Sequence, residues 1–287
     1  MEKIKAQFGI LISSVDIAGI NMKENILDIS DAKEIGVFDN RPVFRINRDV
    51  ILVETARDLL YENRIDEIYD VNYWIFASRH KAESGIATLT AHSPGNWTSE
   101  NTYGGEPEEL CPTDPALIKS AIRNIYIAHK IHRPSRDYRV SLEVTHHGPT
   151  ELKRPCVFME IGSGPDQWSD RVAGRLMAEA ILKTCASLPA TIGALGFGGG
   201  HYPEKFTNIS LFSEYSTGHI MPKYVSEKIR NEIIDEAIKK NGYVDLAIID
   251  WKGLKSAVRK KIIDRLEMHG IEYVKSSSID VSEKLLS

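Results

Sequence analysis

Short apolar runs and longer amphipathic segments alternate along this chain. The short runs predict β-strands at 5–14, 74–78, 86–90, 139–145, 156–161, 190–197 and 244–250. Segments with apolar residues three or four positions apart predict helices at 49–62, 115–131, 166–188, 222–240 and 253–269. Asp114-Pro115 marks the start of the second helix, because aspartate is a common helix cap and proline favours the first helical position.

The order of these elements predicts an α/β fold. Strands and helices alternate in the second half, and connections of this length join parallel strands, so we expect a mainly parallel sheet with helices on both faces, in three layers. No repeat or break in composition marks a boundary, which favours one domain over 1–287 rather than two. Residues 91–114 are dense in Gly, Pro, Ser and Asn and predict a long loop, a kind of segment that is often functional.

Composition narrows the class of protein. With 42% hydrophobic and 26% charged residues, the chain is typical of a globular protein with a full core. A net charge of −4 argues against coating a long stretch of nucleic acid, but it leaves a local basic patch open. The three cysteines lie far apart without CxxC spacing, which indicates a reducing compartment and no thiolate zinc knuckle. No apolar run fits a signal peptide or a membrane span, so we expect a cytoplasmic protein without membrane association.

Histidines carry the first indication of chemistry. Six of the nine directly follow strand-like stretches: His80, His92, His146, His147, His201 and His219. In an open α/β sheet, ligands bind beyond the carboxyl ends of the strands, so histidines at several such ends are expected to meet in space. Imidazole is the commonest protein ligand for catalytic divalent metals, and the pattern therefore predicts a metal-dependent hydrolase.

The segment 143–150 is the densest in polar groups. Alternation along the strand places Glu143 and Thr145 on one face, and His146 and His147 follow directly. A single histidine in this position more often caps a strand end, but two beside a same-strand glutamate favour a metal site. The chain contains neither a HExxH helix nor the paired-cysteine pattern of zinc deaminases.

Two further loops offer groups for catalysis. Glu160 precedes a strand-to-helix turn at Ser163, where backbone N–H groups could bind an anion. Ser163 is also a possible nucleophile, although the spacing is not that of a nucleophile elbow, and Glu160 is equally compatible with a structural acceptor. Gly199 and Gly200 precede His201 in a triple-glycine loop that lacks the features of a P-loop. It either lets a ligand approach the backbone closely or is simply flexible.

Together, five motifs in this order resemble the archaeal and plant type of D-aminoacyl-tRNA deacylase. They are Ser78-Arg-His80, His92-Ser-Pro-Gly-Asn96, Thr145-His-His-Gly-Pro-Thr150, Glu160-Ile-Gly-Ser163 and Gly198-Gly-Gly-His-Tyr202. The resemblance runs from the first strand through His219. It implies an enzyme that cleaves the ester between a D-amino acid and the 3′ end of tRNA, with zinc as cofactor. It also implies an α/β fold of the phosphorylase/peptidyl-tRNA-hydrolase kind.

This resemblance leads to a hypothesis for the site. His80, His146, His147 and His201, with a carboxylate from Glu143 or Glu160, are expected to hold one or two zinc ions. A bound water of lowered pKa would attack the ester carbonyl. The amides of Gly199 and Gly200, or the helix start at Ser163, would stabilise the oxyanion.

Other residues are expected to bind the substrate. They are His92, Asn96, Thr145, Tyr202 and His219, with Arg133, Arg136 and Arg139 for tRNA phosphates and Trp97 or Tyr202 for stacking on a terminal base. A zinc peptidase or amidohydrolase acting on small molecules could use the same ligands. A non-catalytic RNA-binding protein with a structural zinc site is the other alternative. A monomer is favoured over an oligomer.

Overall fold

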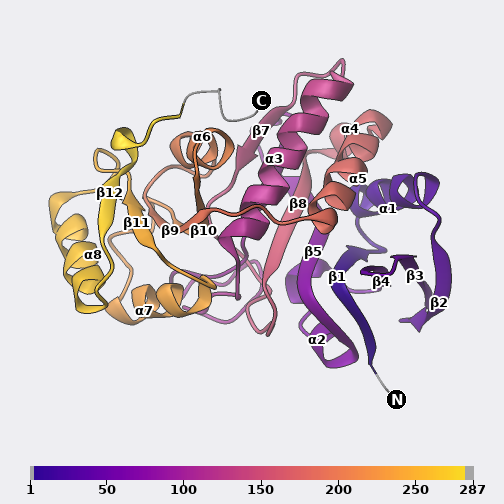
Figure 1. Cartoon of the computed structure of the whole chain (residues 1–287), viewed down its shortest axis with the longest axis horizontal. Helices are drawn as coiled ribbons and strands as arrows, with labels where there is room; N and C mark the ends of the chain where they lie inside the picture. Colours follow the sequence, from indigo (N-terminus) through magenta and orange to yellow (C-terminus); the bar gives the residue numbers. More distant parts are fainter. Residues whose placement is uncertain (1–2, 282–287) are drawn as a thin grey trace.

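The computed structural model describes residues 3–281 and contains an eight-stranded and a four-stranded sheet (Figure 1). The larger sheet has the order β2-β3-β4-β1-β5-β8-β6-β7. Its strands are β1 (Ile4–Ser13), β2 (Lys33–Phe38), β3 (Arg41–Asn47), β4 (Val50–Thr55), β5 (Tyr69–Lys81), β6 (Thr88–His92), β7 (Arg139–Leu142) and β8 (Cys156–Ser163). The smaller sheet, in the order β10-β9-β11-β12, contains β9 (Ile192–Phe197), β10 (Tyr215–Met221), β11 (Leu246–Ile249) and β12 (Tyr273–Lys275).

Strand direction changes across the larger sheet. Strands β4, β1, β5 and β8 are parallel, and β4 and β8 are buried along their whole length, as expected for central parallel strands. Strand β6 then pairs antiparallel with β8, and β7 runs parallel to β6. The last two strands therefore point in the opposite direction to β5 and β8.

Helices cover the two faces of the larger sheet unequally. Against one face pack α1 (Ile17–Asp28), α3 (Pro115–His132) and α5 (Arg171–Ala186), in the main hydrophobic core (Figure 1). The other face carries a smaller apolar cluster that includes Trp74, Phe76 and Phe158, with η1 (Leu59–Tyr61) and α2 (Ile65–Ile68) over it. Because side chains alternate along a strand, Ser78 and His80 continue on this face after Phe76, and Glu160 follows Phe158. The face thus changes from apolar to polar along β5 and β8.

The smaller sheet lies beside the larger one and is fully parallel (Figure 1). Residues of both sheets, among them Ala194 and Ile220 of the smaller one, belong to the main core. Helices α7 (Asn231–Lys240) and α8 (Ser256–Met268) pack on its outer side, with Ile233 and Ile262 in a third apolar cluster. The remaining short elements are α4 (Pro165–Trp168), α6 (Glu204–Phe212) and η2 (Ser276–Ser278).

The expected fold class, a mainly parallel sheet flanked by helices, is confirmed, but several element predictions are wrong. The helix predicted at 49–62 is strand β4 followed by η1, because a fully buried strand has no alternation to distinguish it from a buried helix. The helix predicted at 166–188 is interrupted where Asp170 caps α5. The helix predicted at 222–240 begins only at Asn231. Residues 93–114 form no helix or strand, and within residues 3–281 no helix is long and apolar enough to cross a bilayer.

Candidate active site

Glu160 lies on the polar part of the face opposite α1, α3 and α5, and two histidines approach its carboxylate. Its Oε2 is 3.5 Å from His80 Nδ1 and 3.7 Å from His92 Nε2. His80 comes from the end of β5, whereas His92 comes from the end of β6, which runs the opposite way. The histidines therefore meet over the face of the sheet. The expectation that they gather at one carboxyl edge is wrong, because β6 and β7 are antiparallel to their neighbour.

Glu143 follows β7 and is the second carboxylate of the cluster. One oxygen, Oε1, is 3.1 Å from His80 Nδ1, and the other, Oε2, is 3.5 Å from His146 Nε2 and 2.8 Å from His201 Nε2. His201 comes from the glycine-rich loop after β9 of the smaller sheet. The amide of Val144 donates to the carbonyl oxygen of His201 at 3.1 Å, which fixes this loop beside Glu143. Both sheets therefore contribute to the site.

Three histidines hold the same ring nitrogen, Nδ1, on a backbone carbonyl. The Nδ1 atoms of His146 and His147 donate to the backbone carbonyls of Val144 and Gly148, at 2.8 and 2.7 Å. His92 Nδ1 donates to the carbonyl of Ser93 at 3.2 Å. A carbonyl can only accept, so in a neutral ring the lone pair is on Nε2, the form that binds metals. The rings of His92 and His146 are 4.5 Å apart, and those of His146 and His147 4.4 Å.

The donor atoms fit a divalent metal ion. Within the described residues, three overlapping sets bring their ligand atoms within 4.8 Å of one another: His92–His146–His147, His80–Glu143–His201 and His92–Glu143–Glu160. His92 Nε2 and both oxygens of Glu143 are buried, and none of the ring nitrogens close to Glu143 is aligned to form a hydrogen bond with it. Unsatisfied buried polar atoms are costly, and a bound ion would satisfy these. A mixture of imidazole nitrogens and carboxylate oxygens is typical of catalytic zinc sites.

Burial and mutual charge set the protonation of the cluster. Burial opposes ionisation of Glu160, but His80 and His92 outweigh it and lower its pKa to about 2. Burial likewise opposes ionisation of Glu143, yet contact with His201 and the charge of His80 lower its pKa well below the usual value. Burial and the neighbouring histidines lower the pKa of His147 to about 4 and that of His146 well below its usual value. His146 and His147 are therefore neutral near pH 7, as metal binding requires.

Unlike His92, His146 and His147, which each bind a backbone carbonyl through Nδ1, His80 directs both of its ring nitrogens at side chains. Its Nδ1 faces the two carboxylates, and its Nε2 lies 2.7 Å from the hydroxyl of Tyr202. Burial opposes its charge, but Glu160 and Glu143 raise the pKa of His80. The guanidinium of Arg139 lies over the Tyr202 ring, 5.3 Å from its centroid. Tyr202 is therefore held at its hydroxyl and covered by a cation on its ring.

Three residues expected to contact substrate have their polar atoms engaged inside the protein. Asn96 is buried and donates to the carbonyls of Gly104 and Glu106. His219 Nδ1 is 3.1 Å from Thr145 Oγ1, and its Nε2 donates to the carbonyl of Cys111 at 3.0 Å. Burial lowers the pKa of His219 to about 3. Asn96 thus braces the 93–114 loop from within, and His219, itself in contact with Thr145, ties this loop to β10; the expectation that these three residues touch the substrate is not supported.

Ser163 and Trp97 are also unsuited to the roles expected for them. The Ser163 hydroxyl is buried and donates to the carbonyl of Ile86 at 2.6 Å, so it is not free to act as a nucleophile. Helix α4 after it has only four residues, too few for a useful helix dipole. Trp97 is 3% exposed and therefore cannot stack on a substrate base. The sequence identifies these residue types but does not reveal that their side chains are buried.

The glycine loop borders the open side of the cluster. Gly199 has φ +88°, and a Cβ there would lie 2.9 Å from Pro203 Cβ, so the backbone itself requires glycine. At Gly200 a Cβ would meet nothing within 4 Å. The next side chain, His201, is 36% exposed. Gly200 therefore faces free space beside a candidate metal ligand.

Two threonines next to the cluster were missed in the sequence. Thr88 and Thr90 lie on β6 at alternate positions before His92, and Thr90 pairs with Glu160 in the ladder. The hydroxyls of both are buried without a hydrogen-bond partner. Because side chains alternate along a strand, counting back from His92 in steps of two predicts that Thr88 and Thr90 lie on the same face of the sheet as His92.

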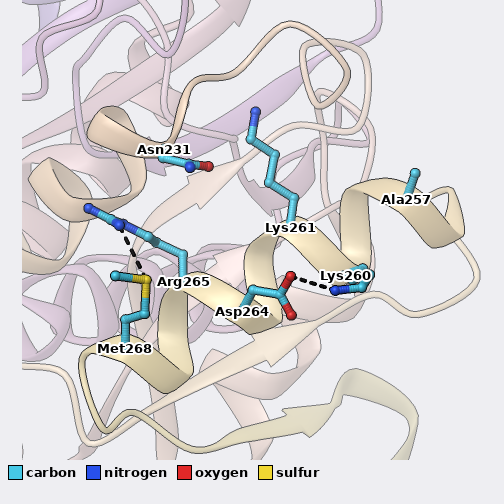
Figure 2. A pocket seen from close by; sticks show the side chains of 7 residues that line it. All are labelled: Asn231, Ala257, Lys260, Lys261, Asp264, Arg265 and Met268. Atoms are coloured by element: carbon cyan, nitrogen blue, oxygen red, sulfur yellow. Dashed lines mark hydrogen bonds and ion pairs between the residues drawn. The ribbon is translucent and has the colours of Figure 1, made fainter.

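Two surface hollows lie outside the cluster. Arg133 and Arg136 line one of about 440 Å³ at the end of α3, together with His129, Lys130, Pro134 and Asp137. The other, of about 400 Å³, lies along α8 (Figure 2). Its three cations are already engaged: Lys260 pairs with Asp264, Arg265 pairs with Asp235, and Lys261 donates to the carbonyl of Ile229. The groove along α8 therefore offers no free charged group comparable to those of the histidine cluster.

Comparison with known proteins identifies the family. The sequence profile described as D-aminoacyl-tRNA deacylase matches residues 67–274. D-aminoacyl-tRNA deacylase of Methanocaldococcus jannaschii is 36% identical over 93% of this chain and 98% of its own, and that of Archaeoglobus fulgidus 32% identical over 96% and 99%. The crystal structure of a conserved protein of unknown function, AF0625, superposes with a TM-score of 0.88 at 31% identity and covers 96% of both chains. The chain belongs to the D-aminoacyl-tRNA deacylase family of enzymes.

Proposed function

We propose that this enzyme hydrolyses the ester of D-aminoacyl-tRNA by zinc-assisted attack of water, releasing a free D-amino acid and tRNA. The observation that supports zinc is that His92 Nε2 and the carboxylate oxygens of Glu143, at the centre of the cluster, are buried without an aligned hydrogen bond. The family match supports the substrate. A monomeric, cytoplasmic protein acting on the 3′ end of tRNA is part of the same proposal.

One or two zinc ions would be held by these side chains. Nε2 of His146 and of His147, together with His92, would form one set of ligands; His80, Glu143 and His201 would form the other. Zinc supplies a Lewis acid that activates water near neutral pH and polarises the ester carbonyl. Glu160 contacts His80 and His92 through its carboxylate and would add negative charge to the site.

The remaining steps belong to the chain's own groups. The amides of Gly199 and Gly200 lie beside His201 and would donate to the developing oxyanion. The free space at Gly200 would accept the side chain of the D-amino acid. The side chain of the L-enantiomer would instead collide with the glycine loop. Arg133 and Arg136, in the hollow at the end of α3, would contact tRNA phosphates.

The test is deacylation of matched D- and L-aminoacyl-tRNAs, with metal analysis of the same preparation. We expect D-selective turnover that a chelator abolishes and zinc restores. Full activity in exhaustively metal-free protein would remove zinc from the mechanism. Turnover of small amides or peptides but not of aminoacyl-tRNA would favour a peptidase or amidohydrolase. Stoichiometric zinc with tRNA binding but no turnover would favour a structural site in an RNA-binding protein.

A further inference from the structure

The segment after β10 borders the open side of the cluster. The Gly198 amide donates to the carbonyl of Met221 at 2.8 Å, and the Lys223 amide donates to that of Gly199 at 2.9 Å. These bonds hold Lys223, and Tyr224 after it, against the glycine loop. Because Gly200 and the exposed part of His201 lie in the same loop, Tyr224 stands at the entrance to the site.

Tyr224 and Lys223 are exposed, and their side chains are available to bind a ligand. Tyr224 is 55% exposed, and among residues 3–281 its hydroxyl forms no hydrogen bond and its ring stacks on no other ring or cation. The Lys223 ammonium is exposed and forms no ion pair with any described residue. By contrast, the hydroxyl of Tyr202 is bound to His80 and its ring is covered by Arg139. Tyr224, rather than Tyr202, therefore offers a ring to a ligand.

The phenol of Tyr224 is also close enough to the cluster to sense its charge. Partial burial, together with the negative charge of Glu143, raises the pKa of Tyr224 to about 12. The phenol therefore stays neutral under all physiological conditions. A neutral aromatic ring at the entrance, next to Gly200 and His201, is suited to stack on a flat group that is joined to the ester.

We propose that Tyr224 and Lys223 form the subsite for the terminal nucleoside of the tRNA, with the base stacked on Tyr224 and a 3′-end phosphate beside Lys223. This rests on the proposed function, because it names the part of the substrate that the entrance receives. Base–aromatic stacking tolerates any base and contributes substantially to binding of single strands. A lysine supplies the charge for the phosphate without reading sequence.

The inference is tested with three substrates: a D-aminoacyl-tRNA, the same amino acid esterified to adenosine, and its methyl ester. Replacing Tyr224 with Leu should raise KM at least about tenfold for the two nucleoside esters. The rise should exceed any change for the methyl ester by a similar factor. Tyr224→Phe, which keeps the ring, should restore KM. Lys223→Gln should raise KM for the tRNA but not for the adenosine ester, which has no phosphate.

Direct binding separates this subsite from the proposed function. The labelled trinucleotide cytidyl-cytidyl-adenosine should bind the zinc-loaded protein, and Tyr224→Leu should weaken its binding at least about fivefold. Tyr243→Leu is the matched control, because Tyr243 packs at the opposite end of β9 against Gly193. Equal losses for all three esters, or unchanged trinucleotide binding in Tyr224→Leu, would overturn the subsite. Trinucleotide binding that depends on Tyr224 without any deacylation would leave the subsite standing and refute the proposed function.

Discussion

Glu143 and His201 meet at 2.8 Å although they belong to different sheets. Glu143 directly follows strand β7 of the eight-stranded sheet, and His201 is carried by the glycine loop after β9 of the four-stranded one. Their contact means that the site exists only when the two sheets are packed together. The same relationship makes Glu143 the residue whose replacement should disturb the largest number of neighbouring ligands.

Replacing Glu143 with Gln should therefore reduce both zinc content and turnover. The amide keeps the shape of the side chain but removes the negative charge that faces His80, His146 and His201. We expect a loss of at least about a hundredfold in kcat/KM and a weaker affinity for zinc. Deacylation assays with metal analysis measure both. Glu179→Gln is the control, because Glu179 pairs with His132 at the same distance of 2.8 Å on the surface. Wild-type zinc content in Glu143→Gln would exclude Glu143 as a ligand.

The free energy of unfolding should depend on pH through His219. Its folded pKa of about 3 lies below the ordinary value of 6.5, so the unfolded state takes up a proton first as the pH falls. Its contribution is fully present above pH 6.5 and is lost progressively as the pH falls from 6.5 towards 3. His219→Gln keeps a donor for Cys111 and should reduce the slope between pH 6 and 4 by up to about 1.4 kcal/mol per pH unit. Denaturant titrations at several pH values measure this; His132→Gln, at the surface, serves as control.

Gly199 and Gly200 should respond differently to alanine. Gly199→Ala is strained by its positive φ and by Pro203, so it should lower the melting temperature. Gly200→Ala has room for its methyl group and should leave the melting temperature close to wild type. If the loop selects the D-enantiomer, Gly200→Ala should lower turnover of D-tyrosyl-tRNA at least about tenfold. An unchanged rate and D/L ratio in folded Gly200→Ala would place the chirality filter elsewhere.

The affinity for tRNA should depend only weakly on salt. With a net charge of −4, the protein has few cations to spare for phosphates. The slope of log affinity against log salt should correspond to roughly two to five phosphates. Arg133→Ala and Arg136→Ala should each lower affinity and the slope without changing D/L preference, whereas Arg171→Ala, an exposed residue paired with Glu24, should not. A steep slope would show that the RNA surface lies elsewhere.

The sequence predicted the fold class and gathered most of the cluster, but for a partly mistaken reason. Histidines after strands were recognised by their position, and this does not depend on strand direction. The antiparallel pairing of β6 with β8 is a long-range contact that no local pattern reveals, so His92 was assigned to the substrate although its Nε2 faces Glu160. The helix predicted at 49–62 is wrong because a buried strand and a buried helix are equally apolar.

Side-chain exposure was the least predictable property. His219 and Asn96 belong to the same motifs as the cluster residues, yet they hold loops from inside. Tyr224 lies outside every motif, and only the pairing of its segment with the glycine loop brings it to the entrance. Tertiary packing decides whether a polar atom faces solvent, an ion or a carbonyl group. This packing cannot be deduced from the local pattern of a single sequence.

Because the site lies between the two sheets, binding of an ion there is coupled to how closely the sheets pack together. The amides of Val144 and Thr145 donate across to the carbonyls of His201 and Ile220. Opening of the junction would break these two bonds and the contact of Glu143 with His201 together. An ion bound there stabilises the closed arrangement by mass action, and slow hydrogen exchange at these two amides would report its presence. If zinc binds at the candidate site, its removal should therefore loosen the junction between the two sheets.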